Sequence, residues 1–574
     1  MPPLSDTAAR IAALDDAFAI SSALARALFI LLCGALCVLL WTLSRARSTL
    51  ARAGVPAVPW RPKFLWRVYA RSERSLLRRV EARFRGVADG GGGSGRRAFG
   101  AVVGACPFVH VGEAKLARDA LRGAAGKSPL YHAFEAFSGT GIFTAEGDDW
   151  DGKRSEVLRA FHAAGLAPLR DRAVEESASV VDELREEVAR GGGEMETRTL
   201  PMLQRLALRV TFAYLTGNSL AEACASVGRS REDVEAEYLD ASTTLRHLIP
   251  ARARSIWIFS DFLYGLTPVG RLEARKIRTT REVSVLALKT AKADSPLGML
   301  RVGEAHLREK PMRVGADTYP KGLLDEATTL LFAGHDTQSA TLSWCLLRLA
   351  ENVELQSELR ASLNDAVIEE ALGLASSRRM AREKTSTSAA ESSKPAWATS
   401  AFAPLLESVI RETLRLHPVA PLVVRMLDSD VSSDKMTIPK GCAVGVWLSS
   451  VHRDESVWDR PEEFDPKRWF GGASHRRTGS TASSNDDDDD VASSARGASS
   501  GLKHRGVGYM PFAYGPRACV GQHLAQVTMR VALAHLIRGF EFTRSADENA
   551  TTPSVGFTVT PSTGAPLRAR ALRG

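Results

Sequence analysis

The sequence predicts a mainly α-helical protein with minor β-sheets. Residues 323–349 are apolar on almost every helical face, which indicates a central, buried helix. A second apolar helical pattern starts just after Cys519, whereas the β-like runs, such as 107–111 and 443–447, are short and dispersed. With 574 residues and 44% hydrophobic content, the chain is long enough for a large core. We expect one large domain over residues 99–574.

The N-terminus predicts a membrane anchor. Residues 27–43 form an uncharged apolar run at the short end of what spans a bilayer. Trp41 lies near the end of this run, and Arg45, Arg47 and Arg52 follow the run. The positive-inside rule therefore predicts that residues 1–26 lie in the lumen and the bulk of the chain in the cytosol. We expect a single-pass protein of the endoplasmic reticulum; a buried core helix is the alternative.

Three segments have compositions typical of linkers or insertions. Residues 44–98 combine a basic helical stretch with a Gly-rich hinge at 89–95. Residues 373–398 are rich in Ser, Ala, Lys and Arg, and residues 474–501 contain five consecutive aspartates, 486–490. A run of like charges is typical of solvated disorder, so we expect both later segments to be surface insertions.

The number and spacing of the cysteines and the net charge limit the compartments and partners that this protein can have. Seven scattered cysteines without a CxxC pair indicate reduced thiols, not a disulfide framework. The net charge of +9 comes without interleaved basic and aromatic residues, so it favours a membrane surface or an acidic protein partner over nucleic acid.

The most informative motif is FxxGxRxCxG, formed by Phe512, Gly515, Arg517, Cys519 and Gly521. A Cys before a helix meets free N–H groups and the positive end of the helix dipole, which favour the thiolate. The two glycines lack Cβ atoms, so we expect a flat cofactor to approach the backbone there. Arg517 supplies a cation for an anionic edge of that cofactor.

Polar residues interrupt the central apolar helix at Ala333-Gly-His-Asp336-Thr337. A Gly inside a helix costs about 1 kcal/mol relative to Ala, and a buried Asp needs a partner or a task. Thr337 can bond back to a carbonyl oxygen and open the helix locally. A kinked structural helix is the alternative, and we interpret His335 as a packing residue.

Glu412 and Arg415 lie at i and i+3 of a helical pattern that ends in Leu-His-Pro, and Arg468 lies in a later Pro-Lys-Arg-Trp segment. An ExxR pair alone is usually a surface ion pair. The central-helix cluster, the ExxR pair and the Cys loop, in this order along residues 99–570, resemble the cytochrome P450 family.

The resemblance implies haem b as cofactor, with Cys519 as the iron ligand. It implies that Asp336 and Thr337 serve oxygen and proton handling, and that Glu412, Arg415 and Arg468 form a buried structural triad. Trp150 and Arg154 match the family's WxxxR motif, so with Arg425 and Arg517 they are candidate haem-propionate contacts. Ala333 stands where many animal fatty-acid ω-hydroxylases carry a glutamate that esterifies haem, so no covalent haem link is expected.

The implied activity is insertion of one oxygen atom of O₂ into a lipophilic substrate, fatty acyl before sterol or carotenoid. Electrons would come from NADPH through cytochrome P450 reductase, with cytochrome b5 as a further partner. We expect Lys153, Arg159, Lys503, Arg505 and Arg530 to dock the reductase. A haem-thiolate isomerase or lyase acting on peroxides and a non-catalytic membrane haem-binding protein are the alternatives. Apolar residues are expected to line the pocket: Phe134, Phe137, Phe332, Val419, Leu422, Val423, Val424, Val555 and Phe557.

Overall fold

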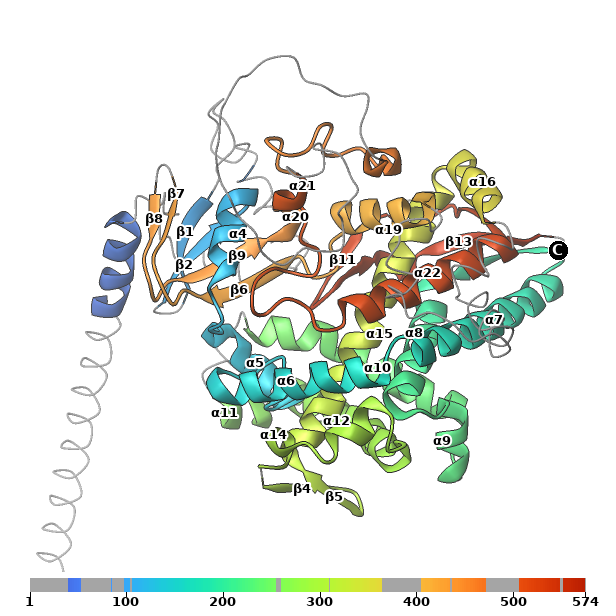
Figure 1. The fold of residues 1–574 in the computed structure, drawn as a ribbon, viewed down its shortest axis with the longest axis horizontal. Coiled ribbons are helices and arrows are strands. Elements are labelled where there is room, and N and C mark those ends of the chain that lie inside the picture. The colour runs from blue at the N-terminus through green and yellow to red at the C-terminus, as the bar shows by residue number, and fades with distance from the viewer. Residues whose placement is uncertain are drawn as a thin grey trace, which may run out of the picture.

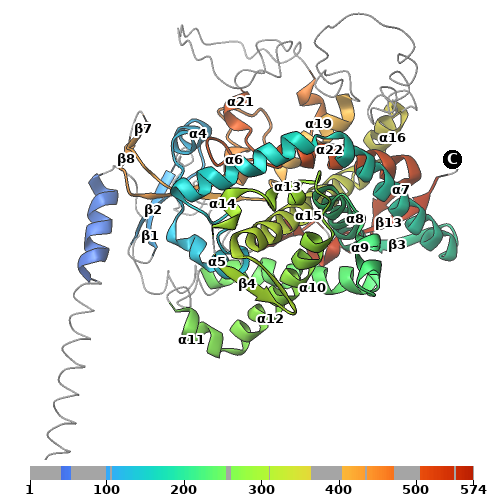
Figure 2. The ribbon, with the colours of Figure 1, turned by 60° about the horizontal axis from the view of Figure 1, so that its bottom comes forward.

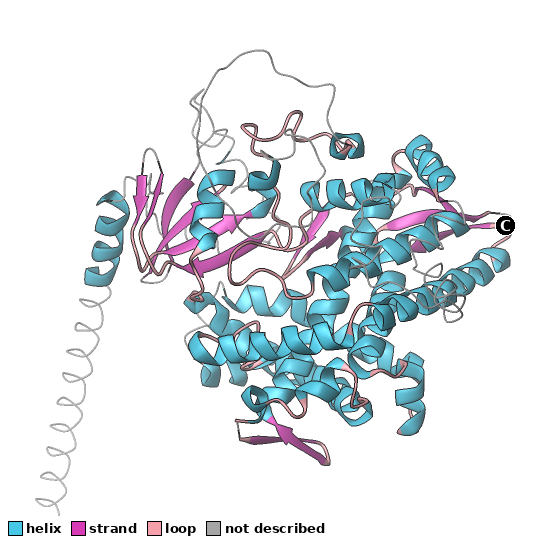
Figure 3. Ribbon diagram, in the orientation of Figure 1, coloured by secondary structure: helices cyan, strands magenta, loops and turns pink. Residues whose placement is uncertain are grey.

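Helices dominate the chain, and small sheets lie at its margins, which confirms the predicted fold class (Figures 1 and 3). The computed structural model describes residues 40–52, 84, 98–103, 106–253, 260–308, 310–363, 404–433, 436–470, 505–547 and 551–572. The four-stranded sheet and the β10–β13–β3 sheet lie at opposite ends of the molecule, with the helices between and below them in Figure 1.

The helices follow the hydrophobic patterning of the sequence. In chain order they are α4 (Ala114–Arg122), α5 (His132–Ser138), α6 (Gly147–Ala164), α7 (Ala167–Arg190), α8 (Thr199–Thr216), α9 (Leu220–Ser226), α10 (Arg231–Ala253), α11 (Asp261–Leu266), α12 (Pro268–Thr290), α13 (Pro296–Leu300), α14 (Glu304–Leu307), α15 (Lys321–Ala350), α16 (Val353–Ser362), α19 (Pro404–Leu416), α20 (Leu448–Val451), α21 (Arg505–Gly508) and α22 (Gln522–Gly539). Short 3₁₀ turns add η2 (Pro129–Tyr131), η5 (Pro466–Trp469) and η7 (Ser562–Gly564).

The strands are short. They are β1 (Ala98–Val103), β2 (Cys106–Val111), β3 (Glu194–Arg198), β4 (Pro311–Val314), β5 (Asp317–Pro320), β6 (Leu422–Met426), β7 (Val431–Ser433), β8 (Met436–Ile438), β9 (Ala443–Trp447), β10 (Phe540–Arg544), β11 (Pro553–Val555), β12 (Val559–Pro561) and β13 (Pro566–Ala571). The order β1-β2-β9-β6 forms the largest sheet, in which β2 and β9 run parallel; β10-β13-β3 forms the next, and three hairpins complete the set.

Helix α15 is the central helix, as predicted. Almost all of its side chains are buried, and its neighbours include α8, α12, α19 and α22 (Figure 2). Packing explains why a glycine, Gly334, occurs inside this helix. An added Cβ at this position would lie 2.4 Å from the Thr211 Cγ2 atom of α8. The glycine therefore permits the close approach of α8 and α15, which offsets its poor helix propensity.

The structure describes only part of the N-terminal segment for which predictions were made. A helix covers residues 40–52, and its Leu50 packs into the core beside Val109 and Ile438, whereas Leu40 and Trp41 are exposed. Within the described ranges, no helix has both the length and the apolar character needed to cross a membrane. Residues 27–39 of the predicted span, the hinge at 89–95 and both predicted insertions lie outside those ranges.

Candidate active site

A tight loop between α21 and α22 carries Cys519. The Cys519 N–H donates to the Phe512 carbonyl oxygen at 2.9 Å, which closes the loop. Gly515 has φ +77°, and an added Cβ would lie 2.0 Å from the Leu121 carbonyl oxygen of α4. The positive φ and the contact with α4 therefore both require glycine at this position. Gly521 is less crowded, since the nearest atoms to an added Cβ are in ordinary contact at 3.9 Å, the Cys519 Sγ among them.

The Cys519 side chain is accessible although protein surrounds it. Burial raises the pKa of the Cys519 thiol, and the Gly521 N–H and the Arg154 charge only partly oppose that effect. In the protein alone, the effect of burial on this pKa is therefore larger than the opposing effects at the start of α22. Bound metal deprotonates a coordinating thiol outright, so iron could supply the missing counter-charge.

One face of α15 is also accessible inside the protein. Ala333 and Thr337, one turn apart, are at least partly exposed, whereas Phe332, His335 and Asp336 beside them are buried. The Thr337 hydroxyl donates back to the Ala333 carbonyl oxygen at 2.8 Å, the local arrangement expected from the sequence. Accessible positions on an otherwise buried helix fit an internal space on this face.

Asp336 points elsewhere, and His335 is a packing residue. One Asp336 oxygen accepts from the Thr558 hydroxyl at 2.6 Å, and the other lies 3.3 Å from Nη1 of Arg246. His335 Nδ1 is 2.9 Å from the Leu331 carbonyl oxygen, and its ring contacts those of Tyr238 and Phe332. Burial lowers the pKa of His335, so this side chain is neutral at physiological pH.

Three cations, Lys127, Arg425 and Arg517, lie close enough to influence one another's pKa, and one of them stacks on Trp150. The Arg517 guanidinium carbon lies 3.9 Å from the centre of the Trp150 ring, and Arg517 Nε donates to the Ala125 carbonyl oxygen. Burial, then Arg425, lowers the pKa of Arg517 to about 10. Burial, then Arg425 and Arg517, lowers the pKa of Lys127 well below its ordinary value. The Glu146 carboxylate only partly opposes these effects on both pKa values.

The cation cluster, formed by Lys127, Arg425 and Arg517, contains hydrogen-bond donors that have no acceptor among the described residues. Both terminal nitrogens of Arg517 and Nε of Arg425 are buried without a hydrogen-bond partner among the described residues. Buried guanidinium groups without acceptors are costly, and carboxylates are their natural partners. The cluster therefore fits a pair of anionic carboxylates such as the propionates of haem.

Arg154 fastens the Cys519 loop to the rest of the protein. Its Nη1 donates to the Ala518 carbonyl oxygen at 3.0 Å, and its Cζ lies 5.6 Å from the Trp150 ring centre. It thus holds the Cys519 loop against α6. Lys127, which was not predicted, lies near Arg425 and Arg517. Sequence reasoning missed Lys127 because it follows α4 in an irregular segment that no motif marks.

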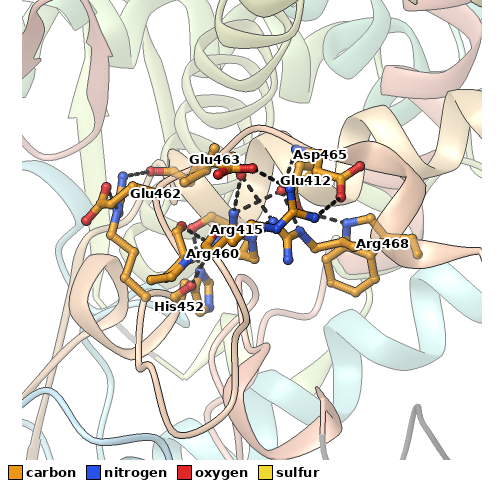
Figure 4. Close-up of polar contacts among 12 residues, drawn as sticks. Glu412, Arg415, His452, Arg460, Glu462, Glu463, Asp465 and Arg468 are labelled. Atoms are coloured by element: carbon orange, nitrogen blue, oxygen red, sulfur yellow. Dashed lines mark hydrogen bonds and ion pairs between the residues drawn. The ribbon is translucent and has the colours of Figure 1, made fainter. Parts of the chain in front are cut away.

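The structure brings Glu412, Arg415 and Arg468 together (Figure 4). Arg415 donates through Nε and Nη2 to both Glu412 oxygens at 2.9 Å, and Arg468 Nε donates to Glu412 Oε1 at 2.9 Å. Glu412 and Arg415 are fully buried. Arg415 also donates to backbone carbonyl oxygens of His452, Pro461 and Glu463. The triad thereby fixes a long irregular segment against α19.

Two consecutive acids of α15 hold the loop before α6. Asp325 Oδ2 accepts from the Thr140 N–H at 3.0 Å, and Glu326 Oε2 accepts from the Ile142 N–H at 2.8 Å. Lys153 of α6 donates to the Thr140 carbonyl oxygen at 2.7 Å. Lys153 is fully buried, so its predicted place on a reductase-docking surface is wrong.

The other predicted docking residues differ in their surroundings. Arg530 is ion-paired with Glu407 at 2.6 Å and is partly buried, whereas Arg159 is exposed. Lys503 and the side chain of Arg505 lie outside the described residues.

Aromatic rings pack together next to α15. Phe134, Phe137, Phe332 and Phe557, all predicted from the sequence, pack together with ring centres 4.9–5.7 Å apart. Phe143, which the sequence analysis did not place in the lining, joins them through Phe134 and Phe557. Val419 and Val423 lie in hydrophobic clusters other than the one that holds these rings.

Comparison with known proteins decides the family. The family model described as Cytochrome P450 matches residues 97–566. The chain belongs to the cytochrome P450 family. The human proteins Cytochrome P450 4F8 and Cytochrome P450 4F2 are each 25% identical to it, over 74% and 75% of this chain and 73% and 74% of theirs. Rat Cytochrome P450 4F6 is 26% identical over 71% of this chain and 67% of its own.

Membership in the cytochrome P450 family makes this protein a monooxygenase, an oxidoreductase that uses haem b and electrons from NADPH delivered through a reductase. The residues fit that cofactor. Cys519 offers an accessible sulfur, and the cation cluster offers unused cationic donors. When bound, a haem with a thiolate ligand supplies the chemistry RH + O₂ + 2e⁻ + 2H⁺ → ROH + H₂O.

Proposed function

We propose that Cys519 is the haem ligand, that Asp336 and Thr337 handle the protons of the reaction, and that Lys127, Arg425 and Arg517 hold the haem propionates. The observation that carries this proposal is the buried cation cluster with unpartnered guanidinium donors, combined with the accessible thiol on the loop that Arg154 fastens to α6. Arg154 and the Glu412 triad keep the loop in place but would not contact the reacting atoms.

The test of the haem ligand is the CO spectrum of the reduced protein. The native protein is expected to show the long-wavelength Soret band typical of a thiolate ligand, and Cys519→Ser is expected to lose it. Cys442→Ala, at a buried thiol of the β8–β9 turn, is the matched control and should retain it. A Cys519→Ser protein with an unchanged band would contradict the assignment.

For the substrate, we propose a fatty acyl compound ahead of a sterol or carotenoid. Support comes from the aromatic lining of Phe134, Phe143, Phe332 and Phe557, which is suited to a slender apolar chain. Dodecanoate, cholesterol and β-carotene should be compared for ligand-induced Soret shifts and for product formed with reductase and NADPH. Product formation from an organic peroxide substrate without reductase would favour an isomerase or lyase, and haem binding without either reaction would favour a non-catalytic role.

For location, we propose a single-pass anchor in the endoplasmic reticulum through residues 27–43, with the catalytic domain in the cytosol. The basic residues after the apolar run support this orientation. Protease added to intact microsomes should digest the catalytic domain. If the domain is protected until detergent is added, the orientation is inverted.

A further inference from the structure

A buried histidine stands between two carboxylates that come from different helices. His306 lies in α14, which packs against both α6 and α15 (Figure 2). Its side chain is fully buried. Its ring nitrogen Nδ1 lies 2.6 Å from Glu156 Oε2 of α6, and Nε2 lies 3.4 Å from Glu326 Oε2 of α15. No motif of the sequence marks this histidine.

Each of the two carboxylates also holds a backbone N–H group. Glu156 Oε1 accepts from the Ala305 N–H at 2.9 Å, so α6 holds α14 in place. Glu326 Oε2 accepts from the Ile142 N–H at 2.8 Å. The oxygen of Glu326 that faces His306 is therefore the same oxygen that fixes the loop before α6.

This loop carries one of the aromatic rings. Phe143 follows Ile142 directly, and its ring centre lies 5.4 Å from that of Phe134 and 5.5 Å from that of Phe557. A displacement of the Ile142 backbone would therefore move a ring of the lining that we propose for the substrate.

The hydrogen bonding between His306 and Glu326 is incomplete. His306 Nε2 and Glu326 Oε1 are buried, and neither has a hydrogen-bond partner among the described residues. Because Nδ1 is engaged with Glu156, a neutral ring keeps its single proton there and presents the lone pair of Nε2 to the Glu326 carboxylate. A second proton, on Nε2, turns this repulsive contact into an ion pair. The protonation of one ring nitrogen thus decides whether Glu326 is repelled or attracted.

The two acids are the charges that act on this ring. Burial alone would lower the pKa of His306, but Glu326 and Glu156 outweigh burial and raise it. The ring therefore keeps its second proton above the pH at which an ordinary histidine, with a pKa of about 6.5, loses it. Neighbouring charged side chains of α6, α15 and the α13–α14 segment are paired elsewhere or exposed: Lys153 with Asp149, Asp325 with Lys321 and Arg281, and Arg159, Arg301 and Glu304 at the surface.

We infer that His306 is a positioning residue that holds Glu326, and with it the loop of residues 139–143, only while Nε2 carries a proton. In the charged state, His306 joins α6, α14 and α15 through both acids. In the neutral state, Nε2 repels the Glu326 carboxylate, and the Ile142 N–H is held less tightly. The inference does not depend on the proposed haem ligand or substrate; only its effect on ligands rests on the proposed aromatic lining.

Hydrogen exchange at Ile142 tests this inference directly. The haem-loaded full-length protein is exchanged into D₂O between about pH 6 and 9, a range that includes the ordinary histidine pKa and values above it. Mass spectrometry of the peptide that covers residues 139–146 gives its protection relative to the intrinsic exchange rate at each pH. Protection should fall several-fold as pH rises, because the acceptor of the Ile142 N–H is displaced. A flat profile in the native protein overturns the inference.

Four variants separate positioning from a merely structural role. His306→Gln should give low protection at every pH, and His306→Lys, which keeps a positive charge, should give high protection at every pH. Glu156→Gln keeps an acceptor for the Ala305 N–H but removes one acid that raises the pKa, so the fall should move to lower pH. His162→Gln, at an exposed position of α6, is the matched control and should match the native profile.

One profile shared by all of these proteins would assign His306 a structural role only and overturn the inference. If His306→Gln fails to load haem, Glu156→Gln still decides, since an unshifted profile in that variant contradicts the role of the histidine.

A ligand titration separates the inference from the proposed substrate. 1-Dodecanol serves as the probe because it has no group that titrates in this pH range. Its dissociation constant from Soret titration should rise with pH in the native and His162→Gln proteins and stay constant in His306→Lys. A native protein that binds no dodecanol contradicts the proposed fatty acyl substrate and leaves the exchange result standing. A constant affinity beside a falling protection overturns the connection between the loop and the pocket.

Discussion

The Arg517 guanidinium stacks on the indole ring of Trp150 at 3.9 Å and keeps both terminal nitrogens free of partners. The ring fixes the plane of a cation whose donors point to no protein acceptor within the described chain. Stacking of this kind pre-organises the guanidinium, so that little side-chain entropy is lost when an anion binds.

Removal of a cluster cation should therefore weaken haem retention. Hydrogen bonds to charged groups contribute about 1.5–3 kcal/mol each, so Arg517→Gln and Lys127→Gln should speed haem loss roughly tenfold or more. Transfer of haem to apomyoglobin measures the rate. Arg159→Gln, an exposed position on α6, should lose haem at the native rate. Equal rates in all three variants would show that the cluster does not hold haem.

Glu412→Ala should leave the protein largely unfolded or without haem. The change strands the buried charges of Arg415 and Arg468, at a cost of about 3–5 kcal/mol. That is a large share of the stability of an ordinary domain. Glu463→Ala is the control, since it removes only an exposed pair with Arg460 and keeps the carbonyl oxygen that Arg415 uses. The measurements are haem content and thermal unfolding; a stable, fully loaded Glu412→Ala protein would contradict the role of the triad.

Gly515→Ala should prevent correct closure of the Cys519 loop. The left-handed backbone alone costs a non-glycine residue about 1–2 kcal/mol. The added Cβ would also meet the Leu121 carbonyl oxygen at 2.0 Å, which backbone cannot avoid without moving. Gly441→Ala has a similar φ of +80° but no atom within 4 Å, so it isolates the backbone term. The CO spectrum should be disturbed in Gly515→Ala and not in Gly441→Ala. Intact spectra in both variants would contradict the proposed steric clash with Leu121.

His306 should make stability depend on pH. Burial alone lowers the pKa of this histidine, but Glu326 at 3.4 Å and Glu156 at 2.6 Å outweigh burial and raise it. A raised folded pKa stabilises the protein fully below the unfolded pKa, about 6.5, and the contribution is lost as pH rises through the folded value. The native Tm should fall across that window, and His306→Gln should flatten the fall. An identical pH profile in the variant would show that His306 is not charged in the fold.

The sequence predicted the local elements well. Strand β9 has the predicted bounds of 443–447, and the predicted helix over 323–349 is α15, Lys321–Ala350. Both depend on short-range apolar periodicity. The motif residues Glu412, Arg415 and Arg468 also meet as expected, because each stands in a segment with its own recognisable spacing.

The missed residues have their roles only through distant contacts. Lys127 acquires its role from Arg425 and Arg517, and Arg246 from Asp336, so no local pattern distinguishes them from ordinary basic residues. Lys153 was misassigned for the same reason. A lysine in a helix that begins with acidic residues resembles a surface residue until the Thr140 carbonyl oxygen covers it.

The fastening of the loop at 139–143 to Asp325 and Glu326 has a consequence for how substrates come and go. Phe143 on this loop and Phe332 on α15 belong to one wall, because the loop backbone hydrogen-bonds to α15 itself and Lys153 connects it to α6. We expect such a wall to move as a single piece with α6 and α15. Traffic of bulky molecules would then depend on the opposite wall, where α10 and the β11–β12 turn meet without a side chain at Gly556. Selectivity for size would be decided at that seam, and it could be altered there without disturbing haem.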